Sequence, residues 1–264
     1  MKKGFGESEK RVKAKKDKKG QVTLFIIIGI VILGAVVGFV LLRKPILEAR
    51  TAPEKIEVRE CVESSVENAL NIILRQGGYA NPQNYYMYKG NKVAFLCYNK
   101  EYYKQCINQE PLYIEHLEKE IKGIIDPKVR DCFFSLEQDY KDRGYAVTSS
   151  PLNLAVLIEP ERIRVLINKT ITLNKGGETK KFDKFDLSIV SNLYGLARTA
   201  IDIVDQEARL CSFEYIGYML VHPEFDITKN NLGTEVSVYN VKEKKTNKEL
   251  NLAIRSCAQP PNGA

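Results

Sequence analysis

The stretch LNLAVLIEPERIRVLI, residues Leu152–Ile167, decides the fold of the larger part of this chain of 264 residues. Leucine, valine and isoleucine alternate with other residues before and after the stretch Glu159-Pro160-Glu161-Arg162. A period of two residues is typical of strands that bury one face. Because the polar stretch between the two runs is short, the sequence predicts a β-hairpin with one face turned to an apolar core.

Further elements extend this pattern in both directions. Leu193–Ala208 places its apolar residues on one face of a helix, and Ser191-Asn192 precede it as an N-cap. The other predicted helices are Glu54–Gln76 and Pro111–Ile125; the other predicted strands are Lys92–Cys97, a run ending at Leu173, Lys181–Ile189, and the hairpin Thr234–Val241 with Glu249–Arg255. Residues 54–264 are therefore predicted to form an α+β domain, with helices first and a largely antiparallel sheet after them.

The segment VTLFIIIGIVILGAVVGFVLL, residues Val22–Leu42, contains no ionisable side chain. A helix of this length is about 30 Å long, which is the thickness of the hydrocarbon core of a bilayer. The sequence therefore predicts a single transmembrane helix at residues 21–43, in contact with membrane lipid, between a basic lead at 1–20 and a juxtamembrane linker at 44–53. The lysine-rich lead and the short Arg43-Lys44 pair after the span predict a cytoplasmic N-terminus and an extracellular domain at the cell surface.

The formal net charge of +7 comes almost entirely from the N-terminal lead. Residues 1–20 contain nine of the 40 Lys and Arg residues, against Glu7, Glu9 and Asp17. The rest of the chain is close to neutral, so the predicted domain offers no basic face to a phosphate backbone. The charge distribution therefore argues against a nucleic-acid partner.

Six cysteines lie in the predicted domain: Cys61, Cys97, Cys106, Cys132, Cys211 and Cys257. An even number of cysteines in an oxidising compartment indicates a disulfide framework, although spacing alone does not choose the pairing. Free buried thiols are the alternative. The chain has 2 histidines and no Cys-x-x-Cys spacing, so we expect no metal site and no cofactor.

The junction Lys18-Lys19-Gly20-Gln21-Val22-Thr23-Leu24-Phe25 places Gly-Gln directly before the apolar run. It resembles the class III signal of archaeal type IV pilin-like proteins, over about residues 15–45. The resemblance implies cleavage between Gly20 and Gln21 by a prepilin-type peptidase, and assembly of the product through its apolar helix. Phe25 stands where this family has an acidic residue. The opening also resembles uncharacterised archaeal membrane-anchored proteins, and an uncleaved anchor is the alternative.

Two short motifs concern self-association and modification. Gly34 and Gly38 lie one helical turn apart in the predicted span, a spacing that lets two helices approach closely. Glycine is also common in membrane helices without such a role. The sequon Asn168-Lys169-Thr170 makes Asn168 a glycosylation candidate.

Half of the 14 tyrosines lie between Tyr79 and Asn108, interleaved with asparagines. Tyrosine offers an apolar ring and a hydroxyl at a small entropic cost, which suits contacts with a saccharide or a protein. The candidate contact residues for a glycan or protein ligand are Tyr85, Tyr86, Tyr88, Tyr102 and Tyr103. A disulfide between Cys97 and Cys106 would stiffen this segment. The alternative is that the rings pack a loop against the core.

The sequence gives little support to catalysis. It contains no Gly-x-Ser-x-Gly, His-Glu-x-x-His, P-loop or dinucleotide-binding motif. We expect His116 on an exposed helix face and His222 in a loop. The protein is therefore not expected to be an enzyme. The leading hypothesis is a pilin-like or pseudopilin-like structural subunit; the alternative is a surface module that binds a glycan or protein partner through the tyrosine-rich segment.

Overall fold

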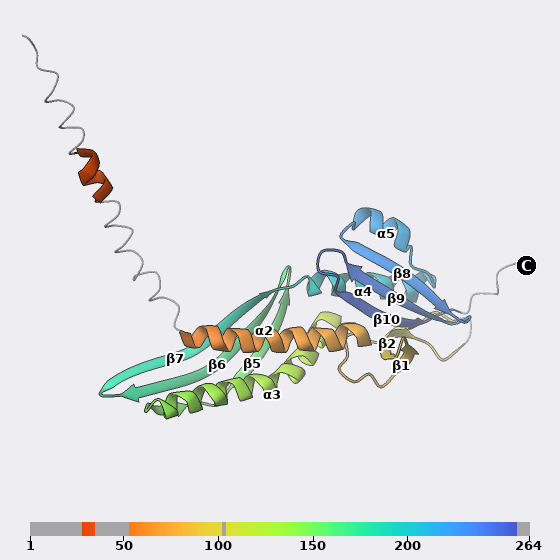
Figure 1. Ribbon diagram of the computed structural model, residues 1–264. Helices are drawn as coiled ribbons and strands as arrows, with labels where there is room; N and C mark the ends of the chain where they lie inside the picture. Colours follow the sequence, from red (N-terminus) through yellow and green to blue (C-terminus); the bar gives the residue numbers. More distant parts are fainter. Residues whose placement is uncertain (1–27, 35–52, 102–103, 258–264) are drawn as a thin grey trace, which may run out of the picture. The chain divides into compact units, whose positions relative to one another are not determined.

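The computed structural model describes residues 28–34, 53–101 and 104–257 (Figure 1). The chain divides into two compact units, Met1–Pro53 and Glu54–Ala264. In the first unit the structure describes a helix at residues 28–34, whose isoleucine, valine and leucine side chains are exposed. The strands, and all the helices discussed below, belong to the second unit.

The predicted transmembrane helix is not found among the residues that the structure describes. Within the described ranges, no helix is both long and apolar enough to cross a membrane. The rest of the expected span, residues 21–27 and 35–43, lies outside the described part of the chain. The predictions of a transmembrane helix and of a single-pass membrane protein are therefore corrected, whereas the α+β fold of the second unit is confirmed.

The first sheet joins strands that lie far apart in the sequence. Its order is β1 (Tyr85–Tyr88), β2 (Asn91–Tyr98), β10 (Glu249–Arg255), β9 (Val236–Glu243) and β8 (Phe225–Leu232), with β3 (Ile107–Asn108) also paired to β2. Neighbouring strands are antiparallel except β2 and β10, which run parallel. Since β1, β2 and β3 precede the second long helix, the predicted order of helices first and sheet after is wrong.

The second sheet is built around the long strand β6 (Arg162–Lys175). One edge of β6 pairs with β7 (Glu178–Val190), and the other edge pairs with β5 (Asn153–Glu159) and β4 (Ala146–Ser149), all antiparallel. β5 and β6 form the predicted hairpin, in the register that the alternation requires. Their apolar side chains are buried on one face, because successive residues of a strand point to opposite sides.

Two long helices, α2 (Pro53–Ile73) and α3 (Tyr113–Asp142), cover the apolar face of the second sheet (Figure 1). α2 continues as the short 3₁₀ helix η1 (Leu74–Gln76), and Gly77 ends it in the left-handed conformation with φ of 73°. Buried residues recur every three or four positions, as in amphipathic helices. They are Val58, Val62, Val66, Ala69, Leu70 and Ile73 on α2, and Leu117, Ile121, Ile125, Val129, Phe133 and Leu136 on α3.

The prediction that the second helix ends near Ile125 is wrong. α3 continues through Pro127 to Asp142, although proline lacks a backbone donor and disfavours the interior of a helix. Val129 and Phe133 keep the spacing of the buried residues before the proline and are themselves buried. The packing of this continuous apolar face therefore outweighs the local cost of the proline.

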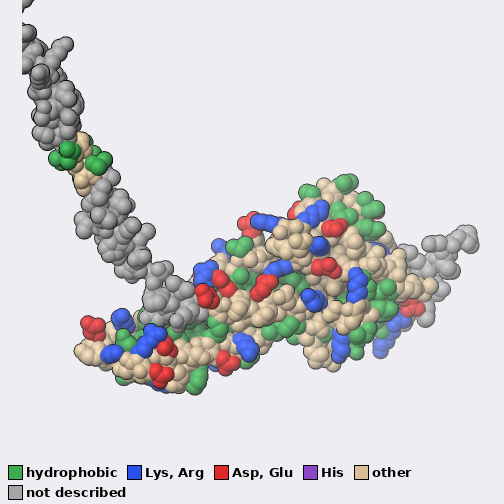
Figure 2. Space-filling view, in the orientation of Figure 1, with side chains coloured by type: hydrophobic (Ala, Val, Ile, Leu, Met, Phe, Trp, Pro, Cys, Tyr) green, Lys and Arg blue, Asp and Glu red, His purple; other side chains and the backbone are tan. Residues whose placement is uncertain are grey.

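The first sheet is covered on one face by α4 (Leu193–Leu210), which matches the helix predicted there, while α5 (Tyr215–Val221) packs against β8 at the sheet edge. α5 was not predicted. Its side chains Ile216, Leu220 and Val221 are exposed, and Figure 2 shows hydrophobic side chains gathered over this helix at the top of the view.

All six cysteines form disulfides, which confirms the prediction of a disulfide-braced domain: Cys61–Cys132, Cys97–Cys106 and Cys211–Cys257. The first joins α2 to α3, with 6.4 Å between the Cα atoms and a sequence separation of 71. The second closes the loop between β2 and β3, and the third ties the end of α4 to the residues after β10. The disulfides are compatible with an oxidising compartment.

Candidate functional site

One face of the first sheet carries a surface of aromatic and amide side chains. The opposite face packs on α4 and belongs to the main core. On the face away from α4, Val93, Phe95, Val238 and Ala253 form a separate apolar cluster, and every side chain packed against it comes from a strand of the same sheet. We call this surface the aromatic–amide face and define it by Tyr86, Tyr88, Phe95, Tyr98, Thr228, Asn230, Asn240 and Asn251.

Strand alternation brings these residues to one side. In β9, Tyr239 and Val241 enter the main core, so Val238 and Asn240 point to the opposite face. In β8, Thr228 lies opposite Asn240 across the antiparallel ladder. The same period therefore places Asn230, Asn240 and Asn251 in a row on one side of the sheet.

Asn240 is the centre of a hydrogen-bond network on this face. Its Oδ1 accepts hydrogen bonds from Asn230 Nδ2 at 2.8 Å and from Thr228 Oγ1 at 3.3 Å. Its Nδ2 donates to Glu249 Oε1 at 3.0 Å and to Asn251 Oδ1 at 2.5 Å. Asn240 and Asn251 are both buried. Both polar atoms of the Asn240 amide therefore have hydrogen-bond partners, and a buried network of this kind holds its side chains in one arrangement.

Tyr88 lies across this face. It belongs to the edge strand β1, yet its hydroxyl donates to Asn240 Oδ1 of β9 at 3.4 Å. β2 and β10 lie between these two strands in the sheet, and adjacent strands are about 4.8 Å apart. The side chains of Tyr88 and Asn240 therefore reach toward each other over the strands between them, and the tyrosine is anchored at its hydroxyl. This hydrogen bond and the packing of Tyr88 on the apolar cluster hold the ring on the aromatic–amide face.

A hollow of about 530 Å³ lies at one end of the aromatic–amide face, and we call it the polar groove. Its walls are the end of α2 with η1, the turn between β1 and β2, and the loop between β9 and β10. Its polar lining residues are Glu67, Asn71, Arg75, Lys89, Asn91, Thr246, Asn247, Lys248, Glu249 and Asn251. Asn251 belongs to both surfaces, so the groove and the aromatic–amide face are continuous.

The tyrosines predicted to contact a ligand divide between the two faces of β1. Tyr86 and Tyr88 belong to the aromatic–amide face and are half-buried. Tyr85 alternates to the other side and is 37% exposed. Tyr102 and Tyr103 lie outside the described residues. The structure therefore brings two of the five predicted side chains together on one surface.

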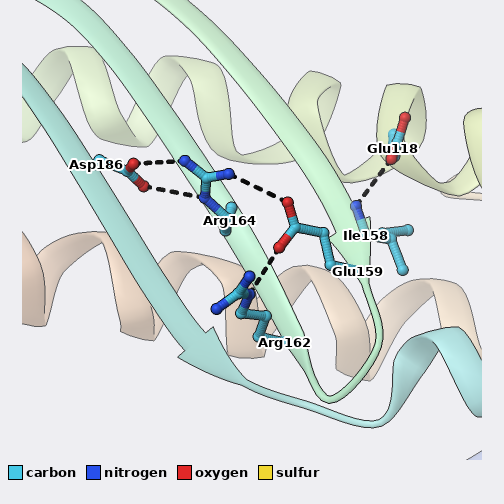
Figure 3. A network of polar contacts seen from close by, with 6 residues as sticks. All are labelled: Glu118, Ile158, Glu159, Arg162, Arg164 and Asp186. Carbon is cyan, nitrogen blue, oxygen red and sulfur yellow. Dashed lines mark hydrogen bonds and ion pairs between the residues drawn. The ribbon is translucent and has the colours of Figure 1, made fainter.

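A network of charged side chains lies on the exposed side of the second sheet (Figure 3). Arg164 donates to Asp186 at 2.5 and 3.3 Å and to Glu159 at 3.1 Å, and Arg162 donates to Glu159 at 2.6 Å. These hydrogen bonds hold the pKa values of Glu159 and Asp186 below their usual range. Since both carboxylates are charged and bound by arginine, the network joins strands and offers no free acid or base.

Figure 3 also shows how one sheet edge is protected. Glu118 of α3 accepts a hydrogen bond through Oε1 from the backbone N–H of Ile158 at 2.8 Å. Ile158 lies in β5, whose outer edge would otherwise offer this donor to another strand. The glutamate therefore caps the edge.

Glu207 of α4 is a buried carboxylate with two donors. It is 2% exposed, and its Oε1 accepts a hydrogen bond from Lys229 Nζ of β8 at 2.8 Å. The hydroxyl of Tyr239 donates to the same oxygen. Burial and the neighbouring Glu207 carboxylate raise the pKa of Tyr239 well above its usual value. This cluster joins α4 to β8 and β9 and is satisfied internally.

A second hollow, of about 810 Å³, lies between α2 and α3. The Cys61–Cys132 disulfide is part of its lining, together with small polar residues and the apolar Ile72 and Ile124. Its charged residues lie on α3 and at the C-terminal end of that helix, where Asp139 and Arg143 pair with each other. The hollow lacks the combination of aromatic rings and amides seen on the first sheet.

The two histidines occupy different environments. The His116 side chain is 13% exposed, its Nε2 lies 3.1 Å from the carbonyl oxygen of Gly78, and its ring packs 4.2 Å from that of Tyr79. The expectation of an exposed His116 is therefore wrong, because Tyr79 covers it. His222 stacks on Tyr218 at 4.3 Å. In the part of the chain that the structure describes, no group of three or more His, Cys, Asp or Glu side chains could hold a metal ion.

Other predicted site residues fall elsewhere. Gly20, Gln21 and Gly38 lie outside the described residues, so leader cleavage and self-association stay predictions. Gly34 is the last described residue of the helix at 28–34, and nothing lies within 4 Å of its Cβ position. Asn168 is exposed at a bulge of β6, and its glycosylation stays a prediction.

Several residues of this surface were missed from the sequence. Asn230, Asn240 and Asn251 lie in strands more than a hundred residues after the tyrosines, and pairing of β10 with β2 brings them close. One signal was present: the polar Asn240 and Lys242 alternate with the apolar Tyr239 and Val241 in β9. This alternation marks a polar face but does not say what lies beside it.

Comparison with known proteins adds no assignment. No protein-family model matches this chain, and no curated protein sequence matches it.

Proposed function

We propose that the protein is a binding protein that holds a saccharide on the aromatic–amide face and does not transform it. The observation that supports this proposal is the ring of Tyr88, which packs on the apolar cluster of the aromatic–amide face and is anchored to Asn240. A sugar ring has an apolar C–H face and an edge of hydroxyl groups. An aromatic platform beside amides matches both parts.

The hydrogen-bonding capacity of the surface favours a ligand with hydroxyl groups. Asn251 accepts a hydrogen bond from Asn240 through Oδ1, while its Nδ2 makes no hydrogen bond with any described residue. Asn71 and Asn247 line the adjoining groove, and their side-chain amides likewise make no hydrogen bond within the described chain. Each amide group both donates and accepts, as a sugar hydroxyl does.

The test is a binding measurement with the full chain, first on an array of oligosaccharides and then by calorimetry with those that bind. Tyr88→Ala removes the platform and should weaken binding about tenfold, since an aromatic contact contributes roughly 0.5–1.5 kcal/mol beyond its buried area. Tyr85→Ala is the matched control, because Tyr85 lies on the same strand but on the other face. This control should leave the affinity unchanged.

A second variant separates the ring from its anchor. Tyr88→Phe keeps the ring and removes the hydrogen bond to Asn240, so we expect a smaller loss of affinity than for alanine. Circular dichroism checks that each variant is folded. Absence of saccharide binding by the folded protein, or equal losses for the Tyr85 and Tyr88 alanine variants, would contradict the proposal.

A further inference from the structure

We infer that the saccharide is acidic and that the polar groove binds its carboxylate between Arg75 and Lys89. This inference rests on the proposed function, because the groove matters only as a continuation of the aromatic–amide face through Asn251.

The charges that line the groove are unevenly compensated. Lys248 Nζ lies 2.6 Å from Glu67 Oε2, so this cation already has a counter-ion. The guanidinium of Arg75 makes no hydrogen bond or ion pair with any described residue, and Arg75 is exposed. The ammonium of Lys89 contacts only the ring of Tyr88, with 5.0 Å from Nζ to the ring centroid. Two cations in one hollow therefore lack an anion in the described structure.

The fold places Lys89 directly beside the proposed platform. Lys89 follows Tyr88 in the turn between β1 and β2, and its φ of 47° turns the chain sharply there. Since the ammonium lies over the ring, a sugar that stacks on Tyr88 would displace it to the rim of the sugar, where it could meet a carboxylate substituent. Arg75 lies in η1 on another wall of the same groove.

The balance of charge favours a single negative group. Glu249 also lines the groove, and its Oε1 accepts a hydrogen bond from Asn240 Nδ2 at 3.0 Å. Against this carboxylate, the free cations leave a small positive excess, which suits a carboxylate better than a phosphate with nearly two charges. The planar guanidinium of arginine also matches the two oxygens of a carboxylate.

The experiment compares matched probes on the full chain: oligosaccharides of galacturonate and of glucuronate, each beside its methyl ester and the corresponding neutral oligosaccharide. Calorimetry at low and at high salt measures each affinity. We expect the free acids to bind about tenfold more tightly than their esters at low salt, because two exposed charge pairs each contribute a few-fold. This difference should shrink as salt screens the charges.

The variant Arg75→Gln combined with Lys89→Gln should abolish the preference for the acid and retain binding of the ester. Lys92→Gln is the control, since Lys92 alternates to the other face of β2 and lies 4.9 Å from the ring centroid of Tyr85. Equal affinity for acid and ester in the unmodified protein would overturn the inference and leave the proposed function standing. Binding of no saccharide would overturn both.

Discussion

Replacing Glu207 with glutamine should lower the free energy of unfolding of the second unit by about 3 kcal/mol. The change keeps the size of the side chain and removes its charge. Lys229, whose side chain is 13% exposed, is then left without its counter-ion, and one amide oxygen must serve both the lysine and Tyr239. Breaking a buried pair by removing one partner costs about 3–5 kcal/mol. Because the Lys229 side chain keeps some exposure to solvent, we expect a loss of unfolding free energy near the lower end of this range.

A second substitution should compensate for the first. Adding Lys229→Met to Glu207→Gln removes the uncompensated charge, and the double variant should recover most of the lost stability, since apolar replacement of both partners is often neutral. Asp205→Asn is the control, because Asp205 is an exposed carboxylate on the same helix.

The assay is unfolding by urea with the disulfides intact, followed by far-ultraviolet circular dichroism because the chain contains no tryptophan. The variants are compared by the urea concentration at the midpoint of unfolding and by the free energy of unfolding extrapolated to water. A loss below about 0.5 kcal/mol for Glu207→Gln would show a surface-like pair and refute the assignment of a buried charge. A double variant as unstable as the single one would refute it equally.

Four further predictions concern other parts of the chain. Cys61→Ser should lower the free energy of unfolding by about 2–4 kcal/mol, because the Cys61–Cys132 disulfide closes a long loop. Thermal unfolding measures this loss, and an unchanged melting temperature would contradict the prediction. Glu118→Ala should leave the backbone N–H of Ile158 without its acceptor and promote self-association through the edge of β5. Analytical ultracentrifugation should then find a larger mass, and a variant that stays monomeric would contradict the role of Glu118 in capping this edge. Arg162 and then Arg164 lower the pKa of Glu159, and Arg164 lowers the pKa of Asp186. The stabilisation from these two carboxylates is complete above their ordinary pKa values of about 4.5 and 3.8 and is lost as the pH falls through the lowered values, so Arg164→Met should reduce the loss of stability in acid, chiefly through Asp186, and an identical pH profile would contradict it. Finally, if the pilin-type signal is used, mass spectrometry of the protein from its natural source should find Gln21 at the N-terminus, and a retained lead would reject it.

Local patterns predicted the parts of the fold that depend on neighbouring residues. The hairpin of β5 and β6 follows from alternation over Leu152–Ile167, and α4 follows from a single apolar face. In both cases the residues that produce the pattern also supply the packing. The end of α3 was missed because Pro127 is a strong local signal, whereas the core contacts beyond it are not visible locally.

Non-local pairing explains most of what the sequence did not predict. β8 is a strand whose second half is partly polar, so it shows little alternation of apolar residues. Its place at the sheet edge depends on β9, not on its own composition. For the predicted transmembrane segment, an apolar run indicates a preference for apolar surroundings, whereas the described residues contain no helix long and apolar enough to span a membrane.

Of the two kinds of side chain in the candidate site, the tyrosines were predicted from the sequence and the asparagines were not. Tyr86 and Tyr88 were selected because tyrosine is a versatile contact residue, and both lie on the aromatic–amide face. Asn240 and Asn251 supply the amides, but their relation to the tyrosines exists only after β10 inserts beside β2. A surface that forms by pairing of strands far apart in the chain cannot be recognised from the residues of any one local stretch of sequence.

The central position of β10 has a consequence for synthesis of the protein. During translation, β1 and β2 leave the ribosome about 150 residues before the strand that separates them from β9. Contacts of such long sequence separation form slowly and late. Until β10 has emerged, the edge of β2 that will receive it remains open to other chains, and Tyr88 has no Asn240 at its far end. The aromatic–amide face therefore forms only at a late step of synthesis, after β10 has paired with β2.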